Sequence, residues 1–434
     1  MMATAIVYAH EPDTSIQTTI PSASRPDVDD EKVGGFLLRC GLRRSAIARA
    51  HEFAVTRFPG HEVVAAPFQG YCSYTLLLLA RPPDARRRDS GCEVERKSSR
   101  STGSVDETCS WEACQDWRLV QFRPRRHGID VGVCAEARKI LLALGVVPEV
   151  EDLGMLTGLE MADGGKGELC GYAIERVDGV SLTDLRKVGA FDVAQRRMEV
   201  VRDLAKVFAE TWKGRRDGEA VVRGKVGGSL RWRLEIMVEG LPREFRAVAR
   251  RVAGELEGIE RLPWVITHGD LVPDNIMVRT EGVQAGGLVG LIDWAEAEWL
   301  PFGVGLYGLE EVLGEDVPVD DGYAAESSSR FEYYPEAEYL RALFWEAVGT
   351  VVKNEEIVRK AKSAQVLGVL LWRGIAFDDG ALGRVVESER DWWDVQRLRA
   401  WLFDRRGLGI VPPSERWWEK VWRDVWGWIG RCVK

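Results

Sequence analysis

The stretch VITHGDLVPDNIMV, residues 265–278, decides how the rest of this sequence is interpreted. It opens with an apolar run, turns at His268-Gly269-Asp270, and returns to an apolar run at 276–278. This pattern predicts a strand, a tight loop and a second strand. Polar side chains held between two buried strands are fixed by the scaffold, so the loop is well placed for chemistry.

A second acidic residue follows in GLVGLIDWAEAEWLPFG, residues 287–303, where an apolar run ends at Asp293. The connection between the two runs, RTEGVQAG, contains glycines and predicts a hairpin that returns Asp293 to the side of Asp270 and Asn275. Asp270 and Asn275 are five residues apart, so one tight loop can direct both side chains into a common cleft. Phosphoryl transfer from ATP needs such a set: one carboxylate near the acceptor hydroxyl, and an amide oxygen and a second carboxylate on Mg²⁺.

The order H-G-D-x-x-x-x-N, a strand, and then I-D-W resembles the motif of the aminoglycoside phosphotransferase and choline kinase-like family. The surrounding residues are similar in particular to fungal members, whose substrates are mostly unassigned. The resemblance implies an α+β, protein-kinase-like fold of two lobes, with a small β-rich N-lobe and a larger, mostly helical C-lobe. It also implies ATP and Mg²⁺ as cofactors and a hydroxyl of a small molecule as the phosphate acceptor. The sequence leaves the identity of that acceptor open.

The same resemblance assigns roles to the residues of the motif. Asp270 matches the catalytic carboxylate, and Asn275 and Asp293 match the Mg²⁺ ligands. His268 matches a structural histidine that braces the loop, since the loop contains no nucleophile for a histidine to activate.

Three residues of the N-terminal half match nucleotide-binding positions of the family. Arg123 in RLVQFRP stands where a basic residue of the third strand meets the phosphates, and Glu136 on the next helix would be its partner. The phosphate-covering loop would be FQGYCSY, residues 68–74, with the single glycine Gly70. Arg presents a planar fork where Lys presents a point charge, so the contact cannot be identical to that of a protein kinase.

Shifts in composition predict the domain boundaries. We expect a disordered tail over residues 1–33, an N-lobe over 34–178 and a helical C-lobe over 179–434. Within the N-lobe, residues 81–116 are charged and rich in serine, with almost no large apolar side chains. They cannot bury enough area to offset their ordering entropy, so we expect a disordered insertion.

Charge and cysteine content restrict the class of protein. A net charge of −9 and a pI near 5.4 argue against a nucleic-acid-binding surface. The eight cysteines include no CxxC pair, which argues against a zinc site and for free thiols in a reducing compartment. No secretory signal is evident and no apolar run is long enough to span a bilayer. We therefore expect a cytoplasmic protein with neither a membrane nor a nucleic-acid partner.

Two other functional interpretations remain open at this stage. A kinase-like binding or scaffold protein without turnover would explain the glycine-poor loop and the arginine at position 123. A protein kinase is disfavoured, because the sequence lacks D-F-G and an A-P-E segment.

Two further features admit both a functional and a structural interpretation. The acids Glu296 and Glu298 and the acidic stretch 314–326 would either receive a cationic substrate or form a solvated edge. The tryptophan-rich segment 414–434 would either pack on the helical lobe or lie on a membrane.

Overall fold

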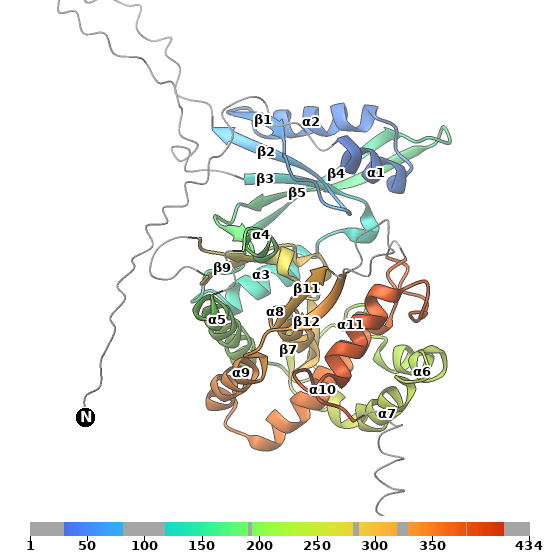
Figure 1. Cartoon of the computed structure of the whole chain (residues 1–434). Coiled ribbons are helices and arrows are strands. Elements are labelled where there is room, and N and C mark those ends of the chain that lie inside the picture. Colours follow the sequence, from blue (N-terminus) through green and yellow to red (C-terminus); the bar gives the residue numbers. More distant parts are fainter. Residues whose placement is uncertain are drawn as a thin grey trace, which may run out of the picture.

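The computed structural model describes residues 30–80, 118–189, 193–280, 286–318, 329–378 and 380–411 of the chain. These residues form two lobes, a small one built on a sheet and a larger one built mainly of helices (Figure 1). The predicted α+β, protein-kinase-like architecture is therefore confirmed. No helix in the described part of the chain is long and apolar enough to cross a membrane.

The N-lobe is an antiparallel sheet of five strands in the order β1-β2-β3-β5-β4. The strands are β1 His61–Ala65, β2 Tyr74–Ala80, β3 Arg118–Arg123, β4 Val150–Glu160 and β5 Lys166–Glu175. Helices α1 (Asp30–Cys40) and α2 (Ser45–Arg57) pack on one face of this sheet (Figure 1).

Strand β3 shows how alternation along a strand separates the core from the site. Val120 and Phe122 are fully buried in the core shared with α1 and α2, and the Phe122 ring meets Phe53 of α2 at 5.7 Å. Because successive side chains of a strand point to opposite faces, Gln121 and Arg123 lie on the other face of the sheet. That face carries the polar groups of the candidate site.

The C-lobe is mostly helical and also contains three small sheets. Its helices are α4 Leu182–Lys187, α5 Ala194–Lys213, α6 Leu230–Gly240, α7 Arg246–Glu260, α8 Tyr307–Val312, α9 Ala337–Val352, α10 Glu355–Gly374 and α11 Trp392–Phe403. The sheets pair β7 (Trp264–Thr267) with β10 (Glu298–Pro301), β11 (Gly314–Pro318) with β12 (Ser329–Tyr333), and β6 (Val180–Ser181) with β8 (Ile276–Val278) and β9 (Leu288–Leu291). Helix α3 (Val131–Ile140) follows β3, and its buried residues belong to the C-lobe core.

The predicted boundaries need one correction. Helix α1 begins at Asp30, and Val33 is only 5% exposed in the core of the N-lobe, so the predicted tail 1–33 extends too far. The glycine pair at 34–35 lowers the helix propensity of this segment, and the residues before it lack periodicity, so the helix was not evident from the sequence. The rest of that tail, residues 1–29, lies outside the described residues, as do 81–117, which hold the predicted insertion, and 412–434, which hold the whole of the tryptophan-rich segment.

Candidate active site

The loop that carries His268 and Asp270 depends on the glycine between them. Gly269 has a φ of +81°, a left-handed conformation that side chains with a Cβ rarely adopt. A Cβ on this residue would lie 1.9 Å from the backbone oxygen of Glu296. The close approach of the 294–296 turn to the loop therefore requires glycine, which explains the H-G-D order of the sequence.

His268 ties the loop to the end of strand β9. Its Nε2 lies 2.8 Å from the backbone oxygen of Ile292, and its Nδ1 accepts a hydrogen bond from the backbone N–H of Asp270 at 3.3 Å. Only the neutral ring with its proton on Nε2 satisfies both contacts. Burial lowers the pKa of His268 to about 4, so the ring stays neutral at physiological pH. The ring therefore links the backbone of Asp270 to that of Ile292, the residue before Asp293.

Asp270 and Asn275 form a closed pair. The Nδ2 of Asn275 donates to both the backbone oxygen and the Oδ2 of Asp270, at 2.8 and 2.9 Å. Both amide hydrogens are thus used within the loop, and the amide oxygen remains as the atom of Asn275 that can serve a cation. Burial, and next the charge of Asp293, raise the pKa of Asp270 to about 7. A carboxyl with such a pKa can exchange a proton near neutral pH.

The predicted hairpin that returns Asp293 to the loop is confirmed. Strands β8 and β9 pair antiparallel, with Ile276 opposite Leu291, and the N–H of Ile292 donates to the backbone oxygen of Asn275 at 3.0 Å. Asp293 then adopts a φ of +61°, a left-handed conformation that Asp tolerates better than most residues. This turn brings its carboxylate toward the N-lobe.

Arg123 of the N-lobe forms an ion pair with Asp293 of the C-lobe. Its Nη2 donates to the Oδ1 of Asp293 at 2.8 Å, although Arg123 itself is only 3% exposed and stands on strand β3 of the other lobe. The ion pair joins the two lobes at the predicted phosphate position. It engages one oxygen of the Asp293 carboxylate, and the second oxygen is not part of this bond.

The predicted pairing of Arg123 with Glu136 is wrong. The carboxylate of Glu136 instead accepts hydrogen bonds from Arg216 at 3.0 Å and from the indole nitrogen of Trp299 at 3.1 Å. The reason is the rotation of helix α3, whose Cys134 and Ala137 are buried in the C-lobe core. Glu136 is therefore directed to the C-lobe and not to the nucleotide position.

Gln121 takes the place expected for Glu136. Its Oε1 accepts from the Nε and the Nη2 of Arg123, at 3.1 and 3.0 Å. We did not predict this contact from the sequence. The signal that was available is the spacing of two residues on one strand, which places Gln121 and Arg123 on the same face of the sheet.

The loop between β1 and β2 is held by a glutamine and not by a row of glycines. The buried side-chain amide of Gln69 donates to the backbone oxygens of Ala66 and Thr75, both at 2.9 Å, and accepts from the N–H of Thr75 at 2.8 Å. Gly70 is exposed and has no positive φ. Tyr71 beside it packs edge-on against Phe377 of the C-lobe, with ring centroids 6.1 Å apart. Rigidity in this loop therefore comes from side-chain contacts.

The two acids that follow Asp293 have different environments. Glu298 is 8% exposed and accepts from the backbone N–H groups of Val226 and Gly227, at 2.9 and 2.7 Å. It is neither a solvated edge nor a receptor for a cationic substrate, because its oxygens anchor the 226–227 turn. Glu296 is partly exposed, and Lys225 lies 3.9 Å from it.

Helix α8 supports the loop through a contact that was not predicted from the sequence. The hydroxyl of Tyr307 accepts from the N–H of Leu271, next to Asp270, at 3.1 Å. The consecutive acids Glu310 and Glu311 are buried on this helix, where Arg341 bonds the first and Arg397 bonds the second. Buried carboxylates paired in this way hold α8, and with it the loop, in one arrangement.

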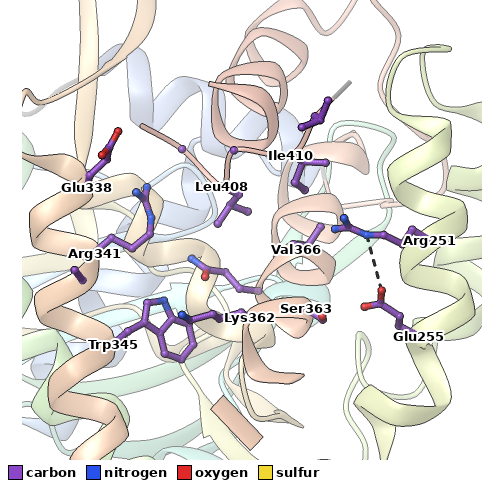
Figure 2. A pocket seen from close by; sticks show the side chains of 15 residues that line it. Arg251, Glu255, Glu338, Arg341, Trp345, Lys362, Ser363, Val366, Leu408 and Ile410 are labelled. Carbon is purple, nitrogen blue, oxygen red and sulfur yellow. Dashed lines mark ion pairs between the residues drawn. The ribbon is translucent and has the colours of Figure 1, made fainter. Parts of the chain in front are cut away.

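One hollow in the described part of the C-lobe lies apart from this site. It has a volume of about 650 Å³ and lies between α7, α9, α10 and residues 407–411. Trp345, Val366, Leu408 and Ile410 line its apolar part, and the ion pair between Arg251 and Glu255 stands at one side (Figure 2). None of the predicted site residues lines it.

The donor set of the site suits Mg²⁺ better than a transition metal. In the described residues no group of three His, Cys, Asp or Glu side chains gathers to form a metal site. Mg²⁺, however, is commonly bound by one or two protein oxygens, with water and substrate phosphates completing the shell. The Asp293 carboxylate and the amide oxygen of Asn275 are hard oxygen donors of this kind, so the residues present fit that ion.

One protein-family model matches this chain. The model of the phosphotransferase enzyme family matches residues 111–337, which are 227 of the 434 residues. Among curated proteins, none matches the sequence. A solved structure from Ralstonia eutropha JMP134, whose own assignment as an aminoglycoside phosphotransferase is provisional, aligns with 12% identity and a TM-score of 0.41. The alignment covers 86% of this chain and 94% of that one.

Proposed function

Because the chain belongs to the phosphotransferase enzyme family, we propose that it transfers a phosphoryl group from ATP, held with Mg²⁺, to a hydroxyl of a small molecule. The observation that carries the proposal is the hydrogen-bonded pair of Asp270 and Asn275, with Asp293 returned to this loop by the β8–β9 hairpin and bound by Arg123 of the other lobe. A carboxyl that exchanges a proton, two hard oxygen donors and a cation are the groups that phosphoryl transfer needs.

Asp270 acts on the acceptor. Its carboxylate accepts a hydrogen bond from the acceptor hydroxyl and orients it toward the γ-phosphorus of ATP. It takes the hydroxyl proton as the new oxygen–phosphorus bond forms and the bond from the γ-phosphorus to the β–γ bridging oxygen breaks, which releases ADP. The pKa of about 7 supports this role, since the group then changes protonation near the pH at which it works. His268 holds the backbone of Asp270 in place and takes no part in proton transfer.

Asn275 and Asp293 would hold the metal, and Arg123 the phosphates. The ion, when bound, spreads and neutralises the charge of the phosphate oxygens. Arg123 contributes a fixed positive charge on the N-lobe side, and its planar fork suits two phosphate oxygens at once. We place the reaction in the cytoplasm, in keeping with free thiols at Cys40, Cys72, Cys134 and Cys170.

A second candidate is a binding or scaffold protein of the same fold. Two observations favour it: Arg123 and Asp293, the residues assigned to the phosphates and to the metal, are paired with each other, and Gly70 is the single glycine of its loop. In that case the protein would bind a partner or a ligand without transferring phosphate.

The test is ADP formation from Mg·ATP in the presence of a panel of amino alcohols, sugars and cyclitols. We expect acceptor-dependent turnover that the Asp270→Asn variant loses by a factor of about 10³ or more, as is usual for loss of a group that acts on the reacting atoms. Asp274→Asn, an exposed change in the same loop, is the matched control and should retain activity. Equal turnover by Asp270→Asn and the wild type would refute the assignment.

A further inference from the structure

The guanidinium of Arg123 has two anchors of different chemistry. Asp293, in the C-lobe, bonds Nη2 at 2.8 Å. Gln121, on the same strand as Arg123, bonds Nε at 3.1 Å and Nη2 at 3.0 Å. The first anchor carries a charge and belongs to the metal position, whereas the second is neutral and belongs to the sheet.

The identity of the contacting atom of Gln121 follows from its partner. A guanidinium can only donate hydrogen bonds, so the atom that meets both Nε and Nη2 must be the amide oxygen. The backbone of Gln121 is fixed from both sides, since it stands opposite Thr75 of β2 and Tyr172 of β5 in the central strand of the sheet. The acceptor is thus held by a rigid element, which is what a positioning group requires.

We propose that Gln121 is the positioning residue for the phosphate-binding cation: it fixes the fork of Arg123 as a neutral anchor and leaves the positive charge available to ATP. This inference rests on the proposed function and names a residue that its mechanism did not need. A carboxylate in the same place would hold the fork as well, but it would also compete with the phosphate oxygens for the cation.

The neutral anchor would matter most with Mg²⁺ held by Asp293. The Asp293 carboxylate would then share its charge with the metal, and its bond to Arg123 would weaken. Gln121 would still hold Nε and one edge of the fork in place. Arg123 therefore does not have to be reoriented when the nucleotide arrives, and preorganisation of this kind favours binding.

The rival explanation is that Gln121 merely satisfies buried donors of Arg123 and stabilises the fold. Two variants separate the two explanations. Gln121→Leu has a similar size and removes the acceptor, whereas Gln121→Glu keeps an acceptor and adds a negative charge. Arg118→Gln is the matched control, because Arg118 lies on the same strand but is exposed and pairs with Glu151, 3.4 Å away.

The experiment is calorimetric titration of each full-length variant with a non-hydrolysable ATP analogue and Mg²⁺ at pH 8. We expect Kd to rise about tenfold in Gln121→Leu, the usual effect of removing a hydrogen-bond acceptor from a charged group. Gln121→Glu should lose more than Gln121→Leu, because the charge of Arg123 keeps the new carboxylate ionised, and that carboxylate competes with the phosphate oxygens for the cation. Arg118→Gln should bind as the wild type does.

Each outcome has a separate meaning. Wild-type affinity in folded Gln121→Leu and Gln121→Glu, with thermal unfolding as the check on folding, would overturn the positioning role and leave the proposed function standing. Wild-type affinity in folded Gln121→Glu, beside a loss in Gln121→Leu, would overturn the requirement for neutrality. Absence of nucleotide binding in the wild type would overturn the proposed function itself, and this inference with it.

Discussion

Replacing the central carboxylate with an amide should stabilise the protein while it abolishes turnover. In the Asp270→Asn variant the new amide oxygen can still accept the hydrogen bond from Asn275, which the wild-type Oδ2 accepts at 2.9 Å. What the variant loses is a negative charge that is surrounded by protein and faces Asp293. Sites that hold such a charge for function commonly do so at the expense of stability.

The pKa of Asp270 gives the size of this effect. Burial raises that pKa from 3.8 to about 7. At roughly 1.4 kcal/mol per pKa unit, a shift of about 3 units corresponds to a destabilisation of at most ~4 kcal/mol above pH 7. Relaxation and water penetration reduce such effects, so we expect a gain of about 2 kcal/mol for the variant at pH 8.

The sign of the pH dependence follows from the direction of the shift. The folded state binds the proton of Asp270 more tightly than the unfolded chain does, so wild-type stability falls as the pH rises from about 4 to about 7. Below that range both states are protonated, and above it both are ionised. The advantage of Asp270→Asn should therefore be small at pH 4.5, should grow up to pH 7, and should remain constant beyond it.

Urea unfolding of the two proteins at pH 4.5 and pH 8 measures this difference in the free energy of unfolding. Asp274→Asn is the control, since an exposed acid in the same loop should change stability by less than about 0.5 kcal/mol. A variant that is no more stable than the wild type at pH 8, or a gain that is the same at both pH values, would refute the electrostatic reasoning.

Three further predictions concern the groups around the loop. His268→Ala should lower the free energy of unfolding by about 2–4 kcal/mol in urea titrations, because it leaves the Ile292 oxygen and a loop N–H without their partner, and a loss below about 1 kcal/mol would contradict the bracing role. Gly269→Ala should cost more than about 3 kcal/mol or prevent folding, whereas Gly254→Ala on helix α7, where an added Cβ meets nothing within 4 Å, should be stabilising by about 0.5–1 kcal/mol; similar values for both would be inconsistent with the steric argument. Glu136→Gln should change the Kd of Mg·ATP by no more than about twofold, because Glu136 bonds Arg216 and not Arg123. A tenfold rise in Kd would restore the role first predicted for this residue.

The parts of the site that could be predicted from the sequence are those fixed by local chain geometry. The loop from His268 to Asn275 and the hairpin to Asp293 are set by turn residues and short apolar runs, which are visible in one sequence. Gly269 was part of the motif, but the reason for it could not be seen in the sequence. A Cβ at this position would lie 1.9 Å from the backbone oxygen of Glu296, a contact that exists only in the folded protein.

The parts that could not be predicted depend on packing between elements. Whether Glu136 faces Arg123 is decided by the rotation of helix α3, which follows from how Cys134 and Ala137 enter the C-lobe core. Periodicity gives the faces of a helix but not the neighbour that each face meets. Glu298 was interpreted as an exposed acid for the same reason. The two backbone N–H groups that it binds, those of Val226 and Gly227, are distant in sequence, so no local pattern indicates the contact.

The most direct test of the central claim is calorimetric titration of the wild type and of Asp293→Asn with a non-hydrolysable ATP analogue, with and without Mg²⁺. Asn is the matched replacement, because it tolerates the left-handed conformation of residue 293, where φ is +61°, and removes the charge. If Asp293 holds the metal as proposed, tight binding of the nucleotide to the wild type requires Mg²⁺, and binding to Asp293→Asn no longer depends on Mg²⁺. Equal affinity of the wild type with and without Mg²⁺, or no binding at millimolar nucleotide, would contradict it and favour a binding protein without turnover.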